Sequence, residues 1–453
     1  MNKLNKGLFG LTGKAKESLI QKALDKRSAR EPEAQASHRA SHRASPGSRR
    51  PVSDDLCRFD KLPGYRELMV QRLAAEQLNI SNPFFRLHEG TATATSVIDG
   101  QQCINFSSYN YLDLSGHPRV SQAAKDAIDQ YGTSVSASRP VSGERPVQQA
   151  LESALATLHG TEDAVVFVSG HATNVTSIGY LFGAKDLVLH DALIHNSVLQ
   201  GIQLSGAFRL SFPHNDWQAL GRILEQRRHE FERVLIVVEG IYSMDGDHPD
   251  LPRFIELKKR HRAFLMVDEA HSIGVMGERG RGIAEHYDVA GSDVDIWMGT
   301  LSKSMAGCGG YIAGEQALVD HLKFSAPGFL YSVGMPAPMA AASLEAIRVM
   351  EEEPQRVRQL RDRSRYFLAR ARERGLDTGL SCGYSVVPLL CGSSIKAVRL
   401  SNLLLDRGIN VQPIVYPAVE EKLARLRFFI SCAHTEAQID TTLAAISDAL
   451  SQL

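Results

Sequence analysis

Two segments of the 453-residue chain place reactive side chains just after apolar runs. The run Phe264–Asp268 ends in a carboxylate, and His271 follows it closely; the run Ile296–Thr300 is followed by Lys303, which stands between two serines and precedes a glycine-rich stretch. A lysine amine forms an imine with an aldehyde, hydroxyl groups bind phosphate, and a buried carboxylate keeps a pyridine nitrogen protonated. These are the requirements of pyridoxal 5'-phosphate (PLP), a phosphorylated aldehyde cofactor.

Each of these residues has an ordinary explanation when it is considered alone. An aspartate at the end of a strand often caps a helix, and a lysine in a loop is usually solvated. The order and spacing of Asp268, His271, Thr300 and Lys303 favour a cofactor site over that explanation.

The elements that must position these side chains are short apolar runs alternating with longer helical patterns. Such alternation predicts crossover units on a mostly parallel sheet, and runs as apolar as Val234–Glu239 are typical of strands covered on both faces. In such sheets ligands bind beyond the carboxyl ends of the strands, where the polar residues stand. The other predicted strands are Ala164–Ser169, Leu187–His190, Phe264–Asp268, Ile296–Thr300 and Gly310–Ala313.

The composition indicates a globular body that follows a basic head. Residues 1–50 carry 12 Lys and Arg against 4 Asp and Glu, and the remainder carries 39 against 47, so the net charge of zero argues against a dedicated nucleic-acid binder. We expect a head and linker at 1–55, with an amphipathic helix at Lys14–Lys26 and an unpacked stretch at Glu31–Pro51. An N-terminal segment at 56–110, a large cofactor-binding domain at 111–340 and a smaller C-terminal α+β domain at 341–453 follow. The last contains a helical stretch at Leu344–Gly375, strands near Ser385–Leu390 and Leu426–Ser431, and a helix from Glu436.

Location and metal content are also predicted from composition. No stretch has the roughly 18 consecutive apolar residues of a membrane span, and the start lacks the apolar region of a signal peptide, so we expect a cytoplasmic protein. The six cysteines are scattered without Cys-x-x-Cys pairs or histidines at metal spacing. No metal is therefore expected.

From about Phe59 onward the sequence resembles the α-oxoamine synthases, a family of fold-type I PLP enzymes. The motifs occur in the family's order: SYNYLDLSGHP (108–118), GTSVSASRPVSG (132–143), SGHATN (169–174), IHNSVLQG (194–201), EGIYSMDGD (239–247), the Asp268 and Lys303 segments, and RLRFFISCAHT (425–435). The resemblance implies the fold-type I transferase fold, α/β in class, with PLP as the cofactor. It also implies a homodimer, because this family's active site is shared between two subunits.

The resemblance implies that five side chains contact the aldehyde and ring of the cofactor. Lys303 would hold PLP as a Schiff base, Asp268 would pair with the pyridine nitrogen, and His271 would hydrogen-bond the phenolic oxygen. His195 would stack on the pyridine ring, and Ser243 would lie close to the ring hydroxyl. Of these, Lys303, His195, Asp268 and His271 are the expected catalytic residues.

The phosphate is expected at the start of a helix, on the backbone amides of Gly170 and His171, with Thr300 as a further contact. His171 stands where the family usually has an aromatic residue. Ser332, in FLYSVGMP (329–336), resembles the residue that reaches the neighbouring subunit's phosphate, although Val333 and the glycine after it depart from the pattern.

Two residues are expected to meet the amino-acid substrate. Asn110 would lie near it, and Arg427 would hold its carboxylate, for which a guanidinium presents a matching fork of donors. The structural alternative for Arg427 is a strand arginine at the domain edge.

The implied reaction is a decarboxylative condensation of glycine, alanine or serine with an acyl thioester, which gives an α-aminoketone, carbon dioxide and a free thiol. One alternative is a PLP-dependent aminotransferase; those enzymes commonly have a tyrosine where His271 stands. Another is a non-catalytic partner subunit, against which the presence of Lys303 argues directly.

The acyl donor is either a CoA ester or an acyl carrier protein. The stretch Phe59–Phe85 resembles the entry segment of synthases from carrier-protein or polyketide pathways. We hypothesise a carrier-bound donor, which the basic head would attract because carrier proteins are acidic. The alternative is a solvated, disordered head without a docking role.

Overall fold

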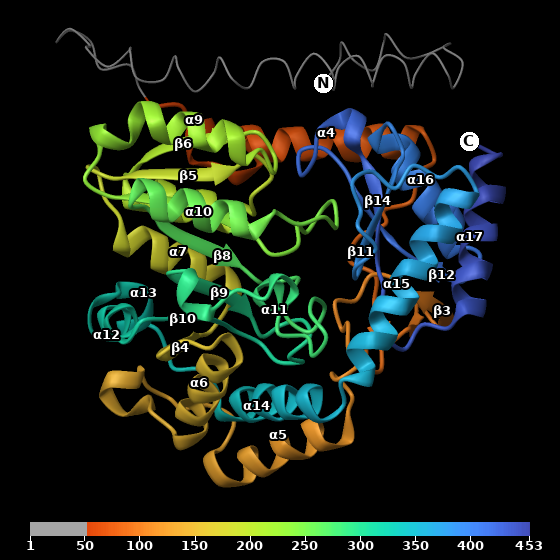
Figure 1. Ribbon diagram of the computed structural model, residues 1–453. Coiled ribbons are helices and arrows are strands. Elements are labelled where there is room, and N and C mark those ends of the chain that lie inside the picture. The colour runs from red at the N-terminus through yellow and green to blue at the C-terminus, as the bar shows by residue number, and fades with distance from the viewer. Residues whose placement is uncertain (1–51) are drawn as a thin grey trace, which may run out of the picture.

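A seven-stranded sheet forms the centre of the structure, a computed structural model that describes residues 52–453 (Figure 1). Within this sheet β10 is antiparallel to both of its neighbours, and the other adjacent strands run parallel. The prediction of a mostly parallel α/β fold is confirmed. In spatial order the strands are β4 (Asp163–Phe167), β10 (Gly310–Gly314), β9 (Ile296–Thr300), β8 (Phe264–Asp268), β7 (Val234–Glu239), β5 (Leu187–Asp191) and β6 (Phe208–Phe212).

Helices cover both faces of this sheet, which explains the apolar character of its central strands. On β7, Ile236 and Val238 pack into one core, whereas Leu235 and Val237 pack into another on the opposite face. The helices of the first core are α6 (Pro146–His159), α9 (Trp217–Arg227), α10 (Leu251–His261), α11 (Ile283–Tyr287) and α14 (Ala337–Glu352), with α5 (Pro118–Tyr131) packed on α14. Those of the second are α7 (Gly170–Leu181), α8 (Asn196–Ser205), α12 (Gln316–Ser325) and α13 (Pro327–Leu330).

A smaller part of the molecule combines both ends of the described chain. Strand β12 (Ile409–Asn410) pairs in parallel with β3 (Gln101–Asn105), so a segment before the large sheet joins one after it. That sheet is completed by β1 (His88–Glu89) and β2 (Thr95–Ile98). A second, antiparallel sheet has the order β11 (Val386–Leu390), β14 (Arg425–Phe429), β13 (Gln412–Ile414), and the helices are α15 (Gln355–Glu373), α16 (Ser394–Leu405) and α17 (Glu436–Leu450).

Two of the differences from the sequence-based prediction have a clear physical reason. The helical stretch predicted at 344–375 is two helices, because α14 ends at Glu352 and α15 begins after Pro354. A proline disrupts a continuing helix by removing a backbone donor and crowding the preceding turn. Strand β6 was not predicted; it lies at the edge of the sheet and is largely exposed, so it lacks the apolar run of a buried strand.

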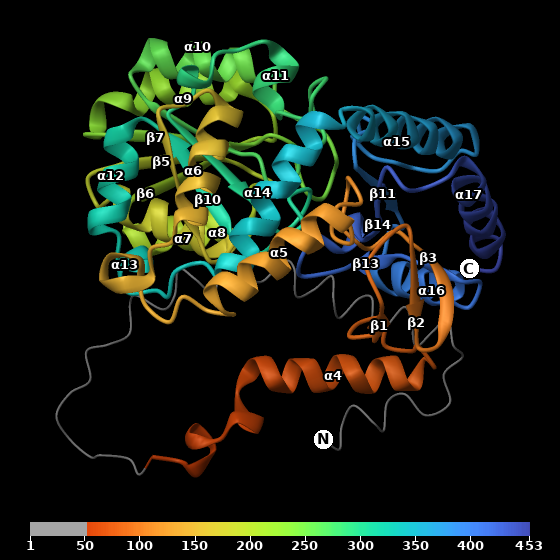
Figure 2. The same cartoon turned by 90° about the horizontal axis from the view of Figure 1, so that it is seen from below.

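The first long helix of the described chain, α4 (Pro63–Gln77), has no buried residue and lies apart from the seven-stranded sheet (Figure 2). The predicted helix at Lys14–Lys26 and the stretch Glu31–Pro51 lie outside the described residues. Within residues 52–453, no helix combines the length and the apolar character needed to cross a membrane.

Candidate active site

A pocket lies at the edge of the large sheet, where the carboxyl ends of the central strands meet. Parallel strands gather their ends at one edge of a sheet, which brings together residues far apart in the sequence. Of the residues predicted to bind the cofactor, all except Ser332 line this pocket. They are Gly170, His171, His195, Ser243, Asp268, His271, Thr300 and Lys303, and they are joined by Asn174, Ser197, Glu239, Ala270 and Met298.

One end of the pocket is the start of helix α7. The Ser169 hydroxyl caps this helix by accepting a hydrogen bond from the Ala172 amide at 3.1 Å. A side chain at Gly170 would place its Cβ only 2.8 Å from Thr300 Oγ1, so glycine is required where the helix meets β9. Backbone amides at a helix start favour an anion, and Thr300 adds a hydroxyl beside them.

Asp268 is one of two buried acidic residues that line the pocket. Its Oδ2 accepts a hydrogen bond from Asn174 Nδ2 at 2.9 Å, and its Oδ1 accepts one from the Ala270 amide at 3.0 Å. The same amide group of Asn174 also donates to Ser197 Oγ at 2.9 Å, which fixes its orientation. These hydrogen bonds fix the position of the carboxylate, which could pair with a pyridine nitrogen.

Two of the three histidines that line the pocket are held by different partners. Nδ1 of His271 lies 2.8 Å from the Tyr111 hydroxyl, and Nδ1 of His195 lies 2.7 Å from Ser197 Oγ. Burial lowers the pKa of His195, and burial together with the charge of Lys303 lowers the pKa of His271 well below its ordinary value. Both rings are therefore neutral near pH 7.

Lys303 lies on the pocket wall, with its ammonium nitrogen 6.0 Å from the centre of the Tyr109 ring. Burial lowers the pKa of Lys303 from 10.5 to about 8, although Asp268 attracts the charged form. A substantial fraction of this lysine is thus a neutral amine near pH 8, as a nucleophile or base must be.

The residue that sequence reasoning missed most clearly is Glu239, the last residue of β7. It pairs with Asp268 across the strands, accepts a hydrogen bond from the Ser243 amide at 3.2 Å, and has a buried Oε1 with no partner among the described residues. Burial and the neighbouring Asp268 raise the pKa of Glu239 well above its ordinary value. Its place at the end of a strand beside Asp268 is the sequence signal that would have identified it.

Arg427 reaches the site from strand β14 of the smaller part. Its Nη1 donates to the Ser243 carbonyl at 3.0 Å, and its guanidinium lies over the Phe429 ring at 4.6 Å. Its buried Nε has no hydrogen-bond partner among the described residues, which leaves a donor for an anionic ligand. Burial lowers the pKa of Arg427, and its charge in turn lowers that of Lys303.

Three predicted residues lie outside the pocket lining: Arg427, which contacts the Ser243 carbonyl from strand β14, and Asn110 and Ser332. The Asn110 side chain donates to the Ala92 carbonyl at 2.9 Å and accepts from the Leu114 amide at 2.9 Å, so its amide is used within its own loop. Ser332 lines a second, separate hollow beside Arg139. Their roles near the amino acid and at a partner's phosphate stay predictions.

The residues of the pocket fit PLP. The Gly170 turn leaves room for a phosphate where any larger residue would clash with Thr300. Asp268 is a carboxylate fixed by hydrogen bonds, and Lys303 is an amine of lowered pKa. These three features lie at separate points of one cavity.

Comparison with known proteins agrees with this geometry. Residues 101–446 match the family model described as aminotransferase class I and II. The 8-amino-7-oxononanoate synthase of Symbiobacterium thermophilum is 40% identical over 352 residues, which cover 78% of this chain and 89% of that protein. 8-Amino-7-oxononanoate synthase 1 of Bacillus subtilis is 37% identical over 79% of this chain and 90% of its own. The structure of Sphingomonas wittichii serine palmitoyltransferase superposes with a TM-score of 0.82 at 28% identity, over 86% of this chain and 98% of that one.

These similarities favour the synthase over both alternatives. The relatives are named as synthases rather than aminotransferases, and a non-catalytic subunit would not need Lys303 in a complete cofactor pocket. A related serine palmitoyltransferase structure contains PLP. The chain therefore belongs to the aminotransferase class I and II family and is one of its α-oxoamine synthases, PLP enzymes that condense an amino acid with an acyl thioester and release carbon dioxide.

Proposed function

We propose that Lys303 holds the cofactor and, once an amino acid has displaced it, moves the proton of the α-carbon. Its lowered pKa supports this role, because a general base works best with a pKa near the working pH. Bound PLP supplies the aldehyde carbon that the lysine amine attacks and the ring that accepts the electrons of the substrate. The observation that carries this proposal is the presence of Lys303, Asp268 and the Gly170 turn in a single pocket.

The other pocket residues bind and orient. Asp268 would keep the pyridine nitrogen charged, and His271, fixed by Tyr111, would present its other nitrogen to the phenolic oxygen. His195 would stack on the ring and, being neutral, would donate a hydrogen bond to the thioester carbonyl. Ser243 would hold the ring hydroxyl.

A lysine variant tests this division of roles. Lys303→Ala should lose both the visible absorbance of the lysine-bound cofactor and turnover, whereas Lys323→Ala, a lysine outside the pocket, should keep both. Survival of absorbance and turnover in Lys303→Ala would refute the assignment.

We further propose that the amino acid is alanine. The relatives are named for 8-amino-7-oxononanoate, in which the amine-bearing carbon lies next to a terminal methyl group. Decarboxylative condensation leaves that CH(NH₂)CH₃ unit when the amino acid is alanine, and the rest of the product then comes from a seven-carbon dicarboxylic acyl group. Arg427, with a free donor at Nε, is the residue for the alanine carboxylate.

Turnover with glycine, alanine and serine, followed as thiol release from an acyl-CoA, tests this choice. Alanine should give the highest kcat/KM. A preference for serine would mean that the chain uses the same amino acid as serine palmitoyltransferase. The assignment of Lys303 would not be affected.

The working form is proposed to be a homodimer. Apolar side chains in residues 52–87 are exposed in the single chain, including Phe59 at 87%, Phe85 at 99% and Leu87 at 76%. So many exposed apolar side chains within one segment are typical of a surface that another chain covers. Sedimentation should give a dimer, and Phe59→Ser with Phe85→Ser should weaken it; a monomeric active wild type would refute the proposal.

We also propose that the acyl donor is bound to an acyl carrier protein. The body beyond residue 50 is acidic and would repel an acidic carrier protein, whereas the basic head would attract one. Deletion of residues 1–50 should lower kcat/KM for a carrier-bound donor and leave that for the CoA ester unchanged. Equal kcat/KM values for the carrier-bound donor in the full-length and truncated proteins would contradict this proposal. The cytoplasmic location likewise stays a prediction.

A further inference from the structure

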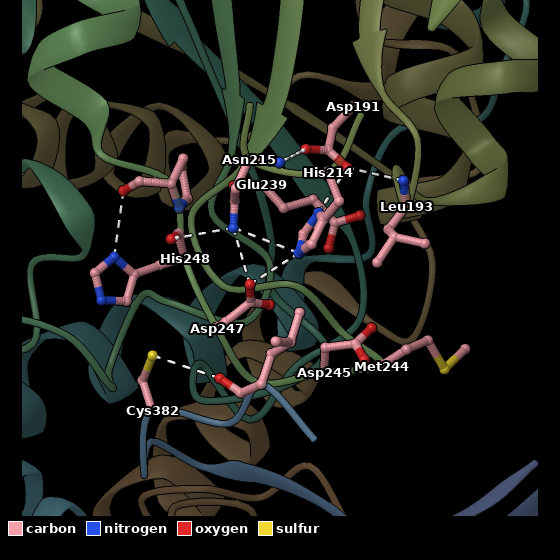
Figure 3. A network of polar contacts seen from close by, with 12 residues as sticks. Asp191, Leu193, His214, Asn215, Glu239, Met244, Asp245, Asp247, His248 and Cys382 are labelled. Carbon is pink, nitrogen blue, oxygen red and sulfur yellow. Dashed lines mark hydrogen bonds and ion pairs between the residues drawn. The ribbon is translucent and has the colours of Figure 1, made fainter. Parts of the chain in front are cut away.

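A buried ionic cluster lies beside the pocket, at the ends of strands β5 and β6 and the loop after β7 (Figure 3). At its centre His214 lies between two carboxylates: its Nδ1 is 2.8 Å from Asp191 Oδ1, and its Nε2 is 2.8 Å from Asp247 Oδ2. Asp191 is fully buried and the side chain of Asp247 is 9% exposed. No residue of this cluster lines the cofactor pocket, so the site described above does not explain it.

The neighbouring residue reinforces the arrangement. Asn215 donates from its backbone to Asp191 Oδ2 at 2.7 Å and from its side chain to Asp247 Oδ2 at 2.8 Å. It does so at a φ of 55°, a left-handed conformation that asparagine tolerates better than most residues. Both carboxylates are thus tied to the same two-residue turn.

The ionic balance of this cluster depends on His214. Burial opposes its charge, but the hydrogen bonds to Asp191 and Asp247 prevail and raise the pKa of His214 to about 10. The imidazolium therefore stands between two carboxylates at physiological pH. Removing it would leave Asp191 and Asp247 as buried charges that face each other across the turn without a cation between them.

Asp247 closes a loop that contains Ser243, a residue of the pocket lining. The Tyr242 amide donates to the Asp247 carbonyl at 2.9 Å, and the Tyr242 ring lies edge-on to His214 at 4.5 Å. Between these two residues the loop contains Ser243, whose carbonyl accepts the 3.0 Å hydrogen bond from Arg427.

The other side of the loop is held by the smaller part of the molecule. Arg425 donates to the Met244 carbonyl at 2.9 Å and to Asp245 Oδ1 at 2.6 Å. The loop is therefore fixed twice, by His214 from the large sheet and by Arg425 from strand β14, and Arg427 rests on the segment between the two attachments.

We propose that His214 is a positioning residue for substrate binding: by clamping Asp191 to Asp247 it fixes the Ser243 carbonyl and thereby the guanidinium of Arg427. The inference rests on the proposed function of Arg427 as the group that holds the amino acid's carboxylate. It goes beyond that function because His214 itself touches neither cofactor nor substrate.

The test compares two ligands of the holoenzyme that differ in one group. Alanine and ethylamine both carry a reactive amine, but only alanine has a carboxylate; binding is followed by the change in visible absorbance. In His214→Gln the Kd of alanine should rise about tenfold, the size of one lost charge-assisted hydrogen bond, while the Kd of ethylamine and of PLP stays unchanged. His229→Gln, an exposed histidine after α9, is the matched control and should leave all three unchanged.

A double-mutant cycle identifies the path. Arg427→Leu should abolish the preference for alanine over ethylamine, and adding His214→Gln should then cost nothing further. Asp247→Asn provides a second variant that keeps the size of the side chain, and it should show the same selective loss of alanine binding if His214→Gln does not fold.

Three results would overturn the inference. Equal weakening of alanine and ethylamine in His214→Gln would mean a general collapse of the pocket, and a further loss on top of Arg427→Leu would mean that His214 acts by another route. A wild type without any preference for alanine over ethylamine would refute the proposed role of Arg427, and the role of His214 with it.

Discussion

The titration of Lys303 is the most direct consequence of the pocket's electrostatics. Burial lowers the pKa of this lysine from 10.5 to about 8, against the attraction of Asp268. At pH 7 about a tenth of the amine is then neutral, roughly 300 times the fraction of an ordinary lysine. Because only the neutral amine attacks an aldehyde, apoenzyme should capture PLP faster as the pH rises, with a midpoint near 8.

Stopped-flow mixing of apoenzyme with PLP between pH 6 and 11 would measure this midpoint from the growth of visible absorbance. Nα-acetyl-lysine in the same buffers corrects for the titration of PLP itself. Asp268→Asn provides the perturbation: removing the attraction for the charged lysine should move the midpoint to lower pH.

The sign of this shift makes the experiment decisive. A wild-type midpoint near 10.5 would mean that the lysine is solvated rather than enclosed by the pocket. A midpoint that moved to higher pH in Asp268→Asn would refute the attraction of Asp268 for the charged lysine.

Three further predictions concern residues around the site. Glu239→Gln should change the Kd of PLP by no more than about threefold, because a buried neutral acid and an amide are similar in shape and hydrogen bonding. Glu239→Leu should raise this Kd about tenfold, because it leaves the Ser243 amide without an acceptor. Equal losses in the two variants, measured by absorbance titration, would show that the acid is charged. Gly246→Ala should lower the free energy of unfolding by more than about 2 kcal/mol, since φ is +73° and the new Cβ would lie 2.0 Å from the Val386 carbonyl oxygen; Gly375→Ala, at φ +69° with open space, should cost only about 1 kcal/mol in urea denaturation. The stability that wild type gains over His214→Gln should be complete below pH 6.5 and fall as the pH rises through about 10, because folding raises the pKa of His214; a constant difference in thermal melts across this range would contradict it.

The sequence predicted the central sheet because its strands have to be apolar on both faces. Val234–Glu239 is buried at every position, and such a run is visible without any structure. The edge strand β6 escaped notice for the opposite reason: one side of it has no neighbouring strand, so Arg209 and its neighbours remain in water. Exposure removes the pattern on which the prediction depends.

Domain boundaries were less visible, because pairing between distant strands leaves little trace in local sequence. Residues 101–105 join a sheet with residues 409–410, more than 300 positions away. The position of α4 could not be predicted from its residues either. Its apolar side chains are exposed within residues 52–453, so no packing partner in the described chain explains them.

The chemistry of this protein was determined by its sequence: an amine at Lys303, a carboxylate at Asp268 and small residues at Gly170 lie where strands end or helices begin, and parallel strands bring such positions to one edge. The tertiary structure alone decided the state and support of these groups. The raised pKa of Glu239, the hydrogen bond from Asn174 to Asp268, and the charged His214 behind Arg427 all arise from burial and from contacts between residues far apart in the chain. The residue types specify which reactions are possible, and the packing around them determines which groups carry a charge and where they point.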